Sequence, residues 1–204
     1  MQDAGIMAVP GPHRYGPRTS RAARRCSAWI VHNDVALLLR LRTRWVRPRL
    51  NPFMKAITQL GSVWFMVWLC AAAWLARAVP GLRGHEWAWQ AAPPLTWAVA
   101  GSHGIVQAVK HWAHRARPYW VADGFGPLTA PLRDYSFPSG HTTAAFAAAG
   151  VFALLFPAAA PLLLTLAAAV GISRMYLGHH FPSDVLAGAL LGTVSALAAC
   201  ALAF

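Results

Sequence analysis

The chain contains few acidic residues and few charges of either sign. Asp and Glu number 6 among 204 residues, and all charged residues together make up 12% of the composition. After residue 55, the carboxylates are those of Glu86, Asp123, Asp134 and Asp184. An ionised side chain costs several kcal/mol at the centre of a bilayer, so long stretches with so few charges are typical of membrane proteins. The composition therefore argues against an ordinary soluble domain.

Cysteine is also scarce. The chain has 3 cysteines, Cys26, Cys70 and Cys200, which lie far apart in the sequence. Two of them lie in apolar runs, and their separations match no metal-ligand spacing. We therefore expect the cysteines to be structurally passive.

Basic residues gather near the N-terminus. Of the 18 Lys and Arg residues, 11 (ten Arg plus Lys55) lie in residues 1–55, within a net charge of +12. The Pro, Gly and Arg of residues 10–25 predict a flexible basic arm over 1–27, ahead of a membrane-embedded domain over 28–204. Because such an arm is not a folded basic surface, no nucleic-acid partner is expected. Membrane lipids are expected instead, since juxtamembrane basic clusters gain roughly 1 kcal/mol per charge at anionic headgroups.

Four apolar stretches predict the fold. They cover residues 62–79, 94–109, 142–172 and 183–204. Pro157 and Pro161 divide the longest stretch, because proline breaks helices and disfavours the helical region in the residue before it. A helix over 139–156 would be about 27 Å long, close to the hydrocarbon thickness of a bilayer, and a second over 161–176 would return. The sequence thus predicts an all-α polytopic membrane bundle of about five transmembrane helices.

Residues 33–50 mix leucines with arginines. This segment is too charged to span a bilayer and suits an N-terminal amphipathic helix lying in the membrane interface. The alternative interpretation is a positively charged flank with no further role.

Three short polar motifs stand among the apolar segments. They are, in order, Lys110-x6-Arg117-Pro118, Pro138-Ser139-Gly140-His141 and Ser173-Arg174-x5-His180-x3-Asp184. A hairpin at 157–161 would send the chain across the membrane and back between the second and third motifs. All three motifs would then share one membrane face, whereas a single unbroken helix would place them on opposite faces.

The histidines in these motifs suit phosphoryl transfer. His180 and Asp184 are four residues apart, so they would share one face of a helix. The carboxylate can accept the Nδ1 proton of His180 and leave Nε2 free as a nucleophile. His141 can protonate a leaving oxygen and later accept a proton from water.

The other motif residues can hold a phosphoryl group. Lys110, Arg117 and Arg174 can neutralise its equatorial oxygens as the transition state forms. Gly140 lets a backbone N–H approach an oxyanion closely, and Ser139 adds a hydroxyl donor. A helix that begins at these residues would also point the positive end of its dipole at the phosphate.

The motif set resembles the type 2 phosphatidic acid phosphatase superfamily of membrane lipid phosphate phosphatases. The resemblance covers residues 110–184, with all three motifs in order and at the family's spacing. It implies that His180 is the nucleophile and forms a phosphohistidine, that Asp184 orients it, and that His141 is general acid and then base. The implied phosphate pocket consists of Lys110, Arg117, Ser139, Gly140 and Arg174. The resemblance implies no metal and no other cofactor, which agrees with the lack of a carboxylate cluster.

Neighbouring polar residues receive other interpretations. His179 does not lie at the spacing that the third motif requires, so His180 is preferred over it. Arg115 is interpreted as a topology anchor after a spanning helix, and His103 as a packed polar residue. Asp184 can cap the last helix as well as orient His180.

The leading hypothesis is an integral membrane phosphatase that hydrolyses a lipid phosphate or diphosphate, of the undecaprenyl diphosphate, phosphatidic acid or phosphatidylglycerol phosphate type. The alternative is a phosphate-binding or anion-binding membrane transporter that uses the same cations. A vanadate-dependent peroxidase is a third possibility. The sequence does not distinguish the lipid or the oligomeric state.

Location and loop function depend on further assumptions. The resemblance indicates a bacterial inner membrane with the site at its outer face, although the Arg-rich start favours the cytoplasmic face. The loop from Tyr119 to Phe137 can be a lid that admits a lipid chain or an aromatic belt without selectivity.

Overall fold

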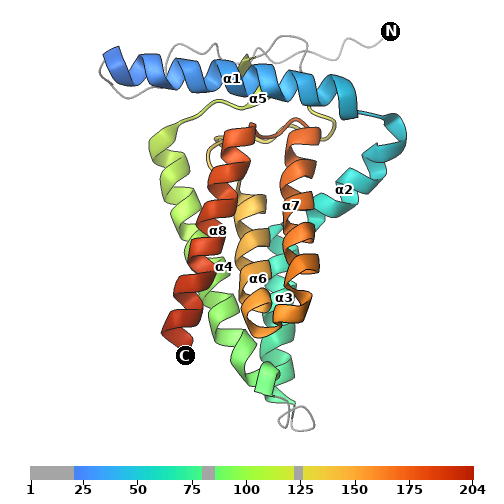
Figure 1. Ribbon diagram of the computed structural model, residues 1–204, viewed down its shortest axis with the longest axis vertical. Helices are drawn as coiled ribbons and strands as arrows, with labels where there is room; N and C mark the ends of the chain where they lie inside the picture. The colour runs from blue at the N-terminus through green and yellow to red at the C-terminus, as the bar shows by residue number, and fades with distance from the viewer. Residues whose placement is uncertain (1–20, 80–85, 122–125) are drawn as a thin grey trace.

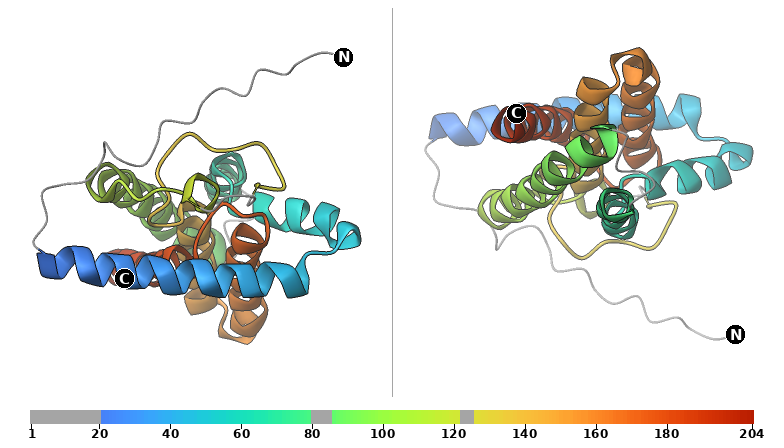
Figure 2. Two further views of the ribbon diagram at one scale, coloured as in Figure 1. Left: turned by 90° about the horizontal axis from the view of Figure 1, so that it is seen from above. Right: turned by 90° about the horizontal axis from the view of Figure 1, so that it is seen from below.

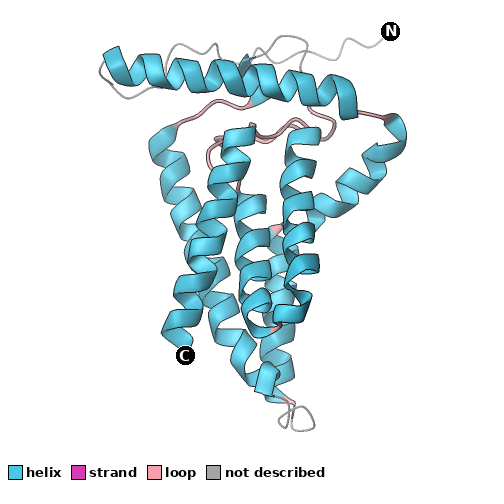
Figure 3. Ribbon diagram, viewed as in Figure 1, coloured by secondary structure: helices cyan, strands magenta, loops and turns pink. Residues whose placement is uncertain are grey.

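The computed structural model describes residues 21–79, 86–121 and 126–204, with side chains from residue 33 onward apart from those of 86–89. Within these ranges all regular secondary structure is helical (Figure 3). The elements are α1 (Arg21–Trp45), η1 (Pro48–Leu50), α2 (Asn51–Gln59), α3 (Val63–Ala78), α4 (Glu86–Ala113), α5 (Pro118–Val121), α6 (Gly140–Leu155), η3 (Pro157–Ala159), α7 (Ala160–Tyr176) and α8 (Pro182–Ala203). The all-α prediction is confirmed for the described part of the chain.

Helices α3, α4, α6, α7 and α8 run along the length of the molecule, and α1 lies across one end of them (Figure 1). Helix α6 is central and contacts α4, α7 and α8. The view along the bundle shows α1 crossing over the ends of α7 and α8 (Figure 2). This arrangement is a helical bundle closed at one end by a transverse helix.

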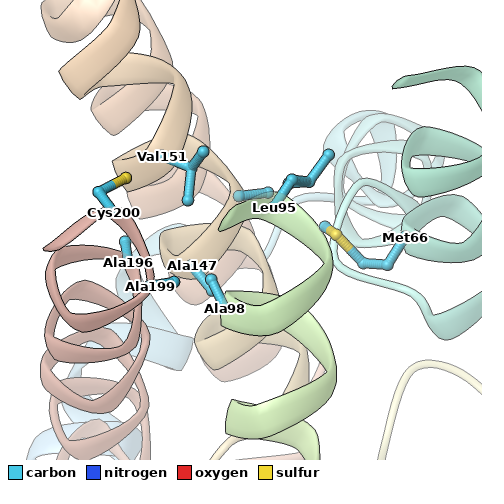
Figure 4. Close-up of a cluster of buried hydrophobic side chains, with 9 residues drawn as sticks. Met66, Leu95, Ala98, Ala147, Val151, Ala196, Ala199 and Cys200 are labelled. Carbon is cyan, nitrogen blue, oxygen red and sulfur yellow. The ribbon is translucent and has the colours of Figure 1, made fainter. Parts of the chain in front are cut away.

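Small side chains let the central helices approach closely. Ala98 on α4, Ala147 on α6 and Ala196 on α8 are each at most 1% exposed and share one core cluster (Figure 4). A Cβ added at Gly150 would lie 2.6 Å from the Cβ of Ala196, so α6 and α8 need glycine there. Such close backbone approach is the usual way in which membrane helices pack. The packing fixes the relative positions of the helix ends.

The predicted helices agree with the observed ones at most boundaries. Predictions over 62–79, 139–156, 161–176 and 183–204 correspond to α3, α6, α7 and α8. The stretch predicted from residue 94 is part of a longer helix, α4, which begins at Glu86 and continues through Pro93 and Pro94. The proline pair at 157 and 161 does form a hairpin, because η3 turns the chain from α6 into α7. The predicted reversal between the second and third motifs is confirmed.

Two described helical segments are long and apolar enough to cross a membrane, namely Pro157–Tyr176 and Pro182–Ala203. Pro48–Gln59 with Val63–Ala78 would add a third span across a 46° bend, and Gly140–Leu155 is apolar but shorter. The chain is therefore an integral membrane protein by the length and composition of its helices. The count of five spans stays a prediction.

Helix α1 contains most of the segment predicted as amphipathic. It ends at Trp45, before Pro48, as expected because the residue that precedes a proline disfavours the helical conformation. Leu38 faces the bundle and is 2% exposed, whereas Leu37 and Leu39 are exposed. Its position in the membrane interface stays a prediction. Residues 1–20 of the predicted arm lie outside the described residues, and 21–27 form the start of α1.

Candidate active site

The motif residues meet at the end of the bundle that α1 crosses. Helix α4 ends just after Lys110 and α7 just after Arg174, while α6 begins at Gly140 and α8 at Pro182. Residues 126–139, which lead into α6, run over the same end (Figure 1). The topology therefore brings together three motifs that span 75 positions, residues 110–184.

His180 lies in the turn between α7 and α8 and is 2% exposed. Its Nδ1 is 3.6 Å from Asp184 Oδ2, and its Nε2 is 3.4 Å from Arg117 Nη1. Ser136 Oγ donates to Asp184 Oδ2 at 2.5 Å and is 3.5 Å from His180 Nδ1. The predicted His–Asp pair is thus present with Nε2 directed at a cation, although the Nδ1 distance is longer than a direct hydrogen bond.

Asp184 is fully buried at the start of α8. Its Oδ2 also accepts a hydrogen bond from the backbone N–H of Phe181 at 2.8 Å, so the predicted capping role is confirmed. Its Oδ1 accepts from Arg115 Nη1 at 2.6 Å. The carboxylate is held from three sides and has little freedom to turn.

Burial lowers the pKa of His180 well below its ordinary value, and the neighbouring cations lower it further. The imidazole is therefore neutral at pH 7, which is the form that has a lone pair for attack. His141, on the first turn of α6, is among the groups that act electrostatically on His180. The same three cations, Lys110, Arg117 and Arg174, thus act electrostatically on both imidazoles.

Three buried cations surround this histidine. Lys110, Arg117 and Arg174 are 6%, 0% and 4% exposed. Arg117 Nη1 donates to the carbonyl of His179 at 2.8 Å, and its Nε donates to the carbonyl of Asp134 at 2.7 Å. Burial of three like charges is costly unless an anion compensates them. Their convergence therefore indicates an anion-binding pocket.

Arg174 has unused hydrogen-bonding capacity. Its Nη1 donates to Thr58 Oγ1 of α2 at 2.9 Å. Its Nε and Nη2 are buried, and no described protein atom accepts from them. A buried donor without an acceptor costs about 1–3 kcal/mol, and more when it is charged. These two nitrogens form a prepared position for an oxyanion.

Asp134 occupies part of the cationic pocket. Its carboxylate accepts from Lys110 Nζ and, at 2.7 Å, from Arg117 Nη2, while its side chain is 51% exposed. Burial by itself would raise the pKa of Asp134, but the hydrogen bond from Lys110 and the charge of Arg117 outweigh it and lower the pKa to about 2. The carboxylate is therefore a permanent negative partner of two pocket cations.

The second motif forms the start of α6. Ser139 is fully buried, and its Oγ lies 2.9 Å from Thr142 Oγ1. Helix α6 begins at Gly140, so the positive end of the helix lies at the site. A Cβ added at Gly140 would make only an ordinary 3.6 Å contact with Val106. Packing does not require glycine here, and the reason for it stays a prediction about the bound oxyanion.

Sequence comparison agrees with this geometry. The profile of the PAP2 superfamily matches residues 92–204, which is more than half of the chain and includes all three motifs. The chain belongs to the PAP2 superfamily.

Several PAP2 proteins resemble it over most of its length. A lipid A 1-phosphatase from Rhizobium johnstonii is 26% identical over 87% of this chain, which spans 66% of that relative's length. Phosphatidylglycerophosphatase B from Bacillus subtilis is 33% identical over 72% of this chain and 71% of its own. The crystal structure of Aquifex aeolicus LpxE, at 28% identity, covers 81% of this chain and 93% of its own with a TM-score of 0.68.

The structure corrects the interpretation of Arg115, which lies within the first PAP2 motif between Lys110 and Arg117. The prediction that Arg115 is only a topology anchor is wrong, because its guanidinium contacts both Asp184 and Asp34.

The prediction that His103 is a packed polar residue is also wrong. Its side chain is exposed on α4, with Nε2 3.3 Å from Gln107 Nε2. By contrast, His179 is buried and turned to Thr129, with Nε2 2.5 Å from the Thr129 hydroxyl.

Sequence reasoning also missed groups outside the PAP2 motifs. Asp134, Ser136 and Thr58 contact motif side chains, and they come from the loop before α6 and from α2. No spacing rule links them to the motifs. In the 119–137 loop, the Tyr119 hydroxyl donates to the carbonyl of Leu132, and residues 122–125 lie outside the described residues. The lid and the aromatic belt both stay predictions for this loop.

Proposed function

We propose that this protein is a membrane phosphatase that removes phosphate from a lipid phosphate or diphosphate through a phosphohistidine at His180. One observation carries the proposal: three buried cations converge on a neutral, buried imidazole that has a carboxylate behind it. The unused Nε and Nη2 of Arg174 supply donors for the oxygens of the phosphoryl group. The phosphatases among the relatives support the same reaction class.

The reaction proceeds in two steps. His180 Nε2 attacks phosphorus, the bond from phosphorus to the leaving oxygen breaks, and the protonated form of His141 gives its proton to that oxygen. Now neutral, His141 removes a proton from water, the water oxygen bonds to phosphorus, the bond from phosphorus to His180 Nε2 breaks, and inorganic phosphate leaves with His141 protonated again. Asp184, whose Oδ2 lies 3.6 Å from Nδ1 of His180, is the carboxylate toward which the Nδ1 proton is directed in both steps. The three cations neutralise charge as it builds on the equatorial oxygens in both transition states.

The hydrocarbon part of the substrate occupies an apolar cavity beside the site. The cavity has a volume of about 380 Å³, lies between α3, α4 and α6, and reaches Gly140 and Thr143 at the site end. None of the pocket cations lines it. A lipid whose phosphate lies among the cations can therefore place its chain between these helices.

A phosphate-release assay tests this function. Detergent-solubilised protein is given undecaprenyl diphosphate, phosphatidic acid, phosphatidylglycerol phosphate or lipid A, with and without EDTA, and His180→Ala serves as the blank. We expect release from at least one lipid that continues in EDTA, because the proposed chemistry uses only side chains. Tight phosphate binding without turnover of any lipid would favour the transporter alternative. Loss of release in EDTA would contradict the mechanism.

Asp134→Asn is expected to lower the inhibition constant of inorganic phosphate, a competitive inhibitor, by roughly 2- to 5-fold. This range corresponds to an ion-pair energy of up to about 1 kcal/mol for a half-exposed carboxylate. The wild-type carboxylate competes with phosphate for Lys110 and Arg117, and its pKa of about 2 keeps it charged at neutral pH. Asp134→Glu keeps the charge and is the matched control. Weaker inhibition in Asp134→Asn would show instead that the carboxylate organises the pocket for the ligand.

The site lies at the outer face of a bacterial inner membrane. The resemblance to phosphatases of undecaprenyl diphosphate supports this face, whereas the arginines that α1 brings to the same end favour the cytoplasm. Phe204 lies at the opposite end (Figure 1). In a background without native cysteines, Phe204→Cys should react with an impermeant maleimide only after the membrane is permeabilised. Labelling in intact cells would place the site in the cytoplasm.

A further inference from the structure

Arg115 is the centre of a charge network behind the proposed nucleophile. Its Nη1 donates to Asp184 Oδ1 and to Ser183 Oγ, each at 2.6 Å, and its Nη2 donates to Asp34 Oδ2 at 2.5 Å. Its guanidinium carbon lies 4.5 Å from the centre of the Phe181 ring. The guanidinium thus joins two carboxylates that are 150 positions apart in the sequence, residues 34 and 184.

Asp34 brings helix α1 into this network. It is 6% exposed, and its Oδ1 accepts from the backbone N–H of Ser183 at 3.1 Å, while its Oδ2 accepts from the Ser183 hydroxyl. Beside it, Leu38 of α1 packs on Phe181 in a small buried cluster. Contacts of α1 with the bundle therefore include the turn that carries His180 and the first turn of α8, in addition to α7.

Charge and burial favour a single role for these contacts. Asp184 is fully buried and Asp34 nearly so, and Arg115 is the described cation that pairs with both. Without that guanidinium, two carboxylates would remain buried behind His180 with no cation. Asp184 Oδ2 faces His180, and Oδ1 is the oxygen that Arg115 holds. Together with the hydrogen bonds from Ser136 and Phe181 to Oδ2, the contact with Arg115 fixes how the carboxylate is rotated toward the imidazole.

We propose that Arg115 and Asp34 are positioning residues that hold Asp184 in register with His180, so that the transverse helix α1 is a working part of the active site. The inference rests on the proposed function, since it assigns these residues a role through Asp184. Neither residue touches the pocket in which the phosphoryl group would bind. They should therefore affect turnover far more than substrate binding.

The first test separates turnover from binding. Arg115→Met should lower kcat for lipid phosphate hydrolysis by about 10- to 100-fold, the range typical when a group that orients an active-site ligand is removed, with KM changed less than about 3-fold. Arg115→Lys should recover only part of this loss. A guanidinium presents separate nitrogens to the two carboxylates, whereas the single ammonium of lysine cannot reproduce this geometry. Asp34→Asn should lower kcat by a smaller factor, since Arg115 keeps its contact with Asp184.

A double-mutant cycle distinguishes positioning from general destabilisation. If Arg115 acts through Asp184, then Arg115→Met added to Asp184→Asn should lower kcat by less than about 2-fold further. By contrast, replacing a residue that only stabilises the fold would lower kcat by the same factor in the wild type and in Asp184→Asn. Arg44→Met is the matched control, because it removes the same charge from an exposed position on α1 and should leave kcat and KM unchanged. Thermal unfolding of each purified variant accompanies the kinetics.

The outcomes are distinct. Wild-type kcat in folded Arg115→Met and Asp34→Asn, together with a large loss in Asp184→Asn, would overturn the positioning role and leave the proposed function intact. Full multiplicative loss in the double mutant would also overturn it. If Arg115→Met does not fold, Arg115→Lys and Asp34→Asn complete the cycle with Asp184→Asn. Absence of phosphate release by the wild-type protein from every lipid would overturn the proposed function and, with it, this inference.

Discussion

Replacing His180 by alanine is expected to lower kcat for phosphate release by at least about 1,000-fold, because the substitution removes the atom that bonds to phosphorus. His179, the adjacent histidine, is directed at Thr129. Phosphate release from the preferred lipid, measured on detergent-solubilised protein, checks the prediction.

His111→Gln is the matched control for this loss. His111 is an exposed imidazole at the end of α4 whose Nδ1 lies 2.8 Å from the carbonyl of Gln107, so its removal should leave kcat within about 2-fold of wild type. A His180→Ala protein that is folded and retains more than a tenth of wild-type turnover would contradict the assignment of the nucleophile.

Arg174→Met has the second-largest expected effect. We expect kcat/KM to fall by about 100- to 1,000-fold, the loss seen when a donor to a developing oxyanion is removed. The reason is structural: Arg174 makes its one described protein hydrogen bond through Nη1 and keeps Nε and Nη2 buried without an acceptor. Methionine fills much of the same volume but supplies no donor.

Stability should respond in the opposite direction. Because the wild-type arginine is a buried cation with unused donors, Arg174→Met should leave the unfolding temperature in phosphate-free buffer unchanged or raised. Added inorganic phosphate should stabilise the wild type and not the variant, since a ligand stabilises only the protein that binds it. Arg133→Met, which removes an exposed arginine from the nearby loop, is the control. Equal stabilisation of Arg174→Met by phosphate would contradict the pocket described here.

The helices and their common end could be predicted from the sequence because both depend on local rules. Apolar length predicted α3, α6, α7 and α8, and the restriction that Pro157 and Pro161 place on the backbone predicted the hairpin between α6 and α7. Motif spacing then placed the cations and histidines together. Each of these steps uses residues close in sequence or a count of membrane crossings.

The network around Asp184 could not be predicted in this way. Arg115 pairs with Asp34 across 81 positions, and Arg174 bonds to Thr58 across 116. Such contacts depend on how α1 and α2 are placed against the bundle, which periodicity does not describe. Asp134 comes from an irregular loop whose path is determined by tertiary contacts such as the hydrogen bond of Arg117 Nε to its carbonyl. Charge alone could not separate Arg115 from a topology anchor.

Direct detection of a phosphoenzyme tests the central claim. Purified protein mixed with a ³²P-labelled lipid phosphate is quenched within milliseconds in alkali, and peptides are analysed for bound label. We expect label that is stable in alkali, labile in acid and located on His180, and that is absent from His180→Ala. Steady release of phosphate without any such adduct, or label on another residue, would contradict the phosphohistidine mechanism.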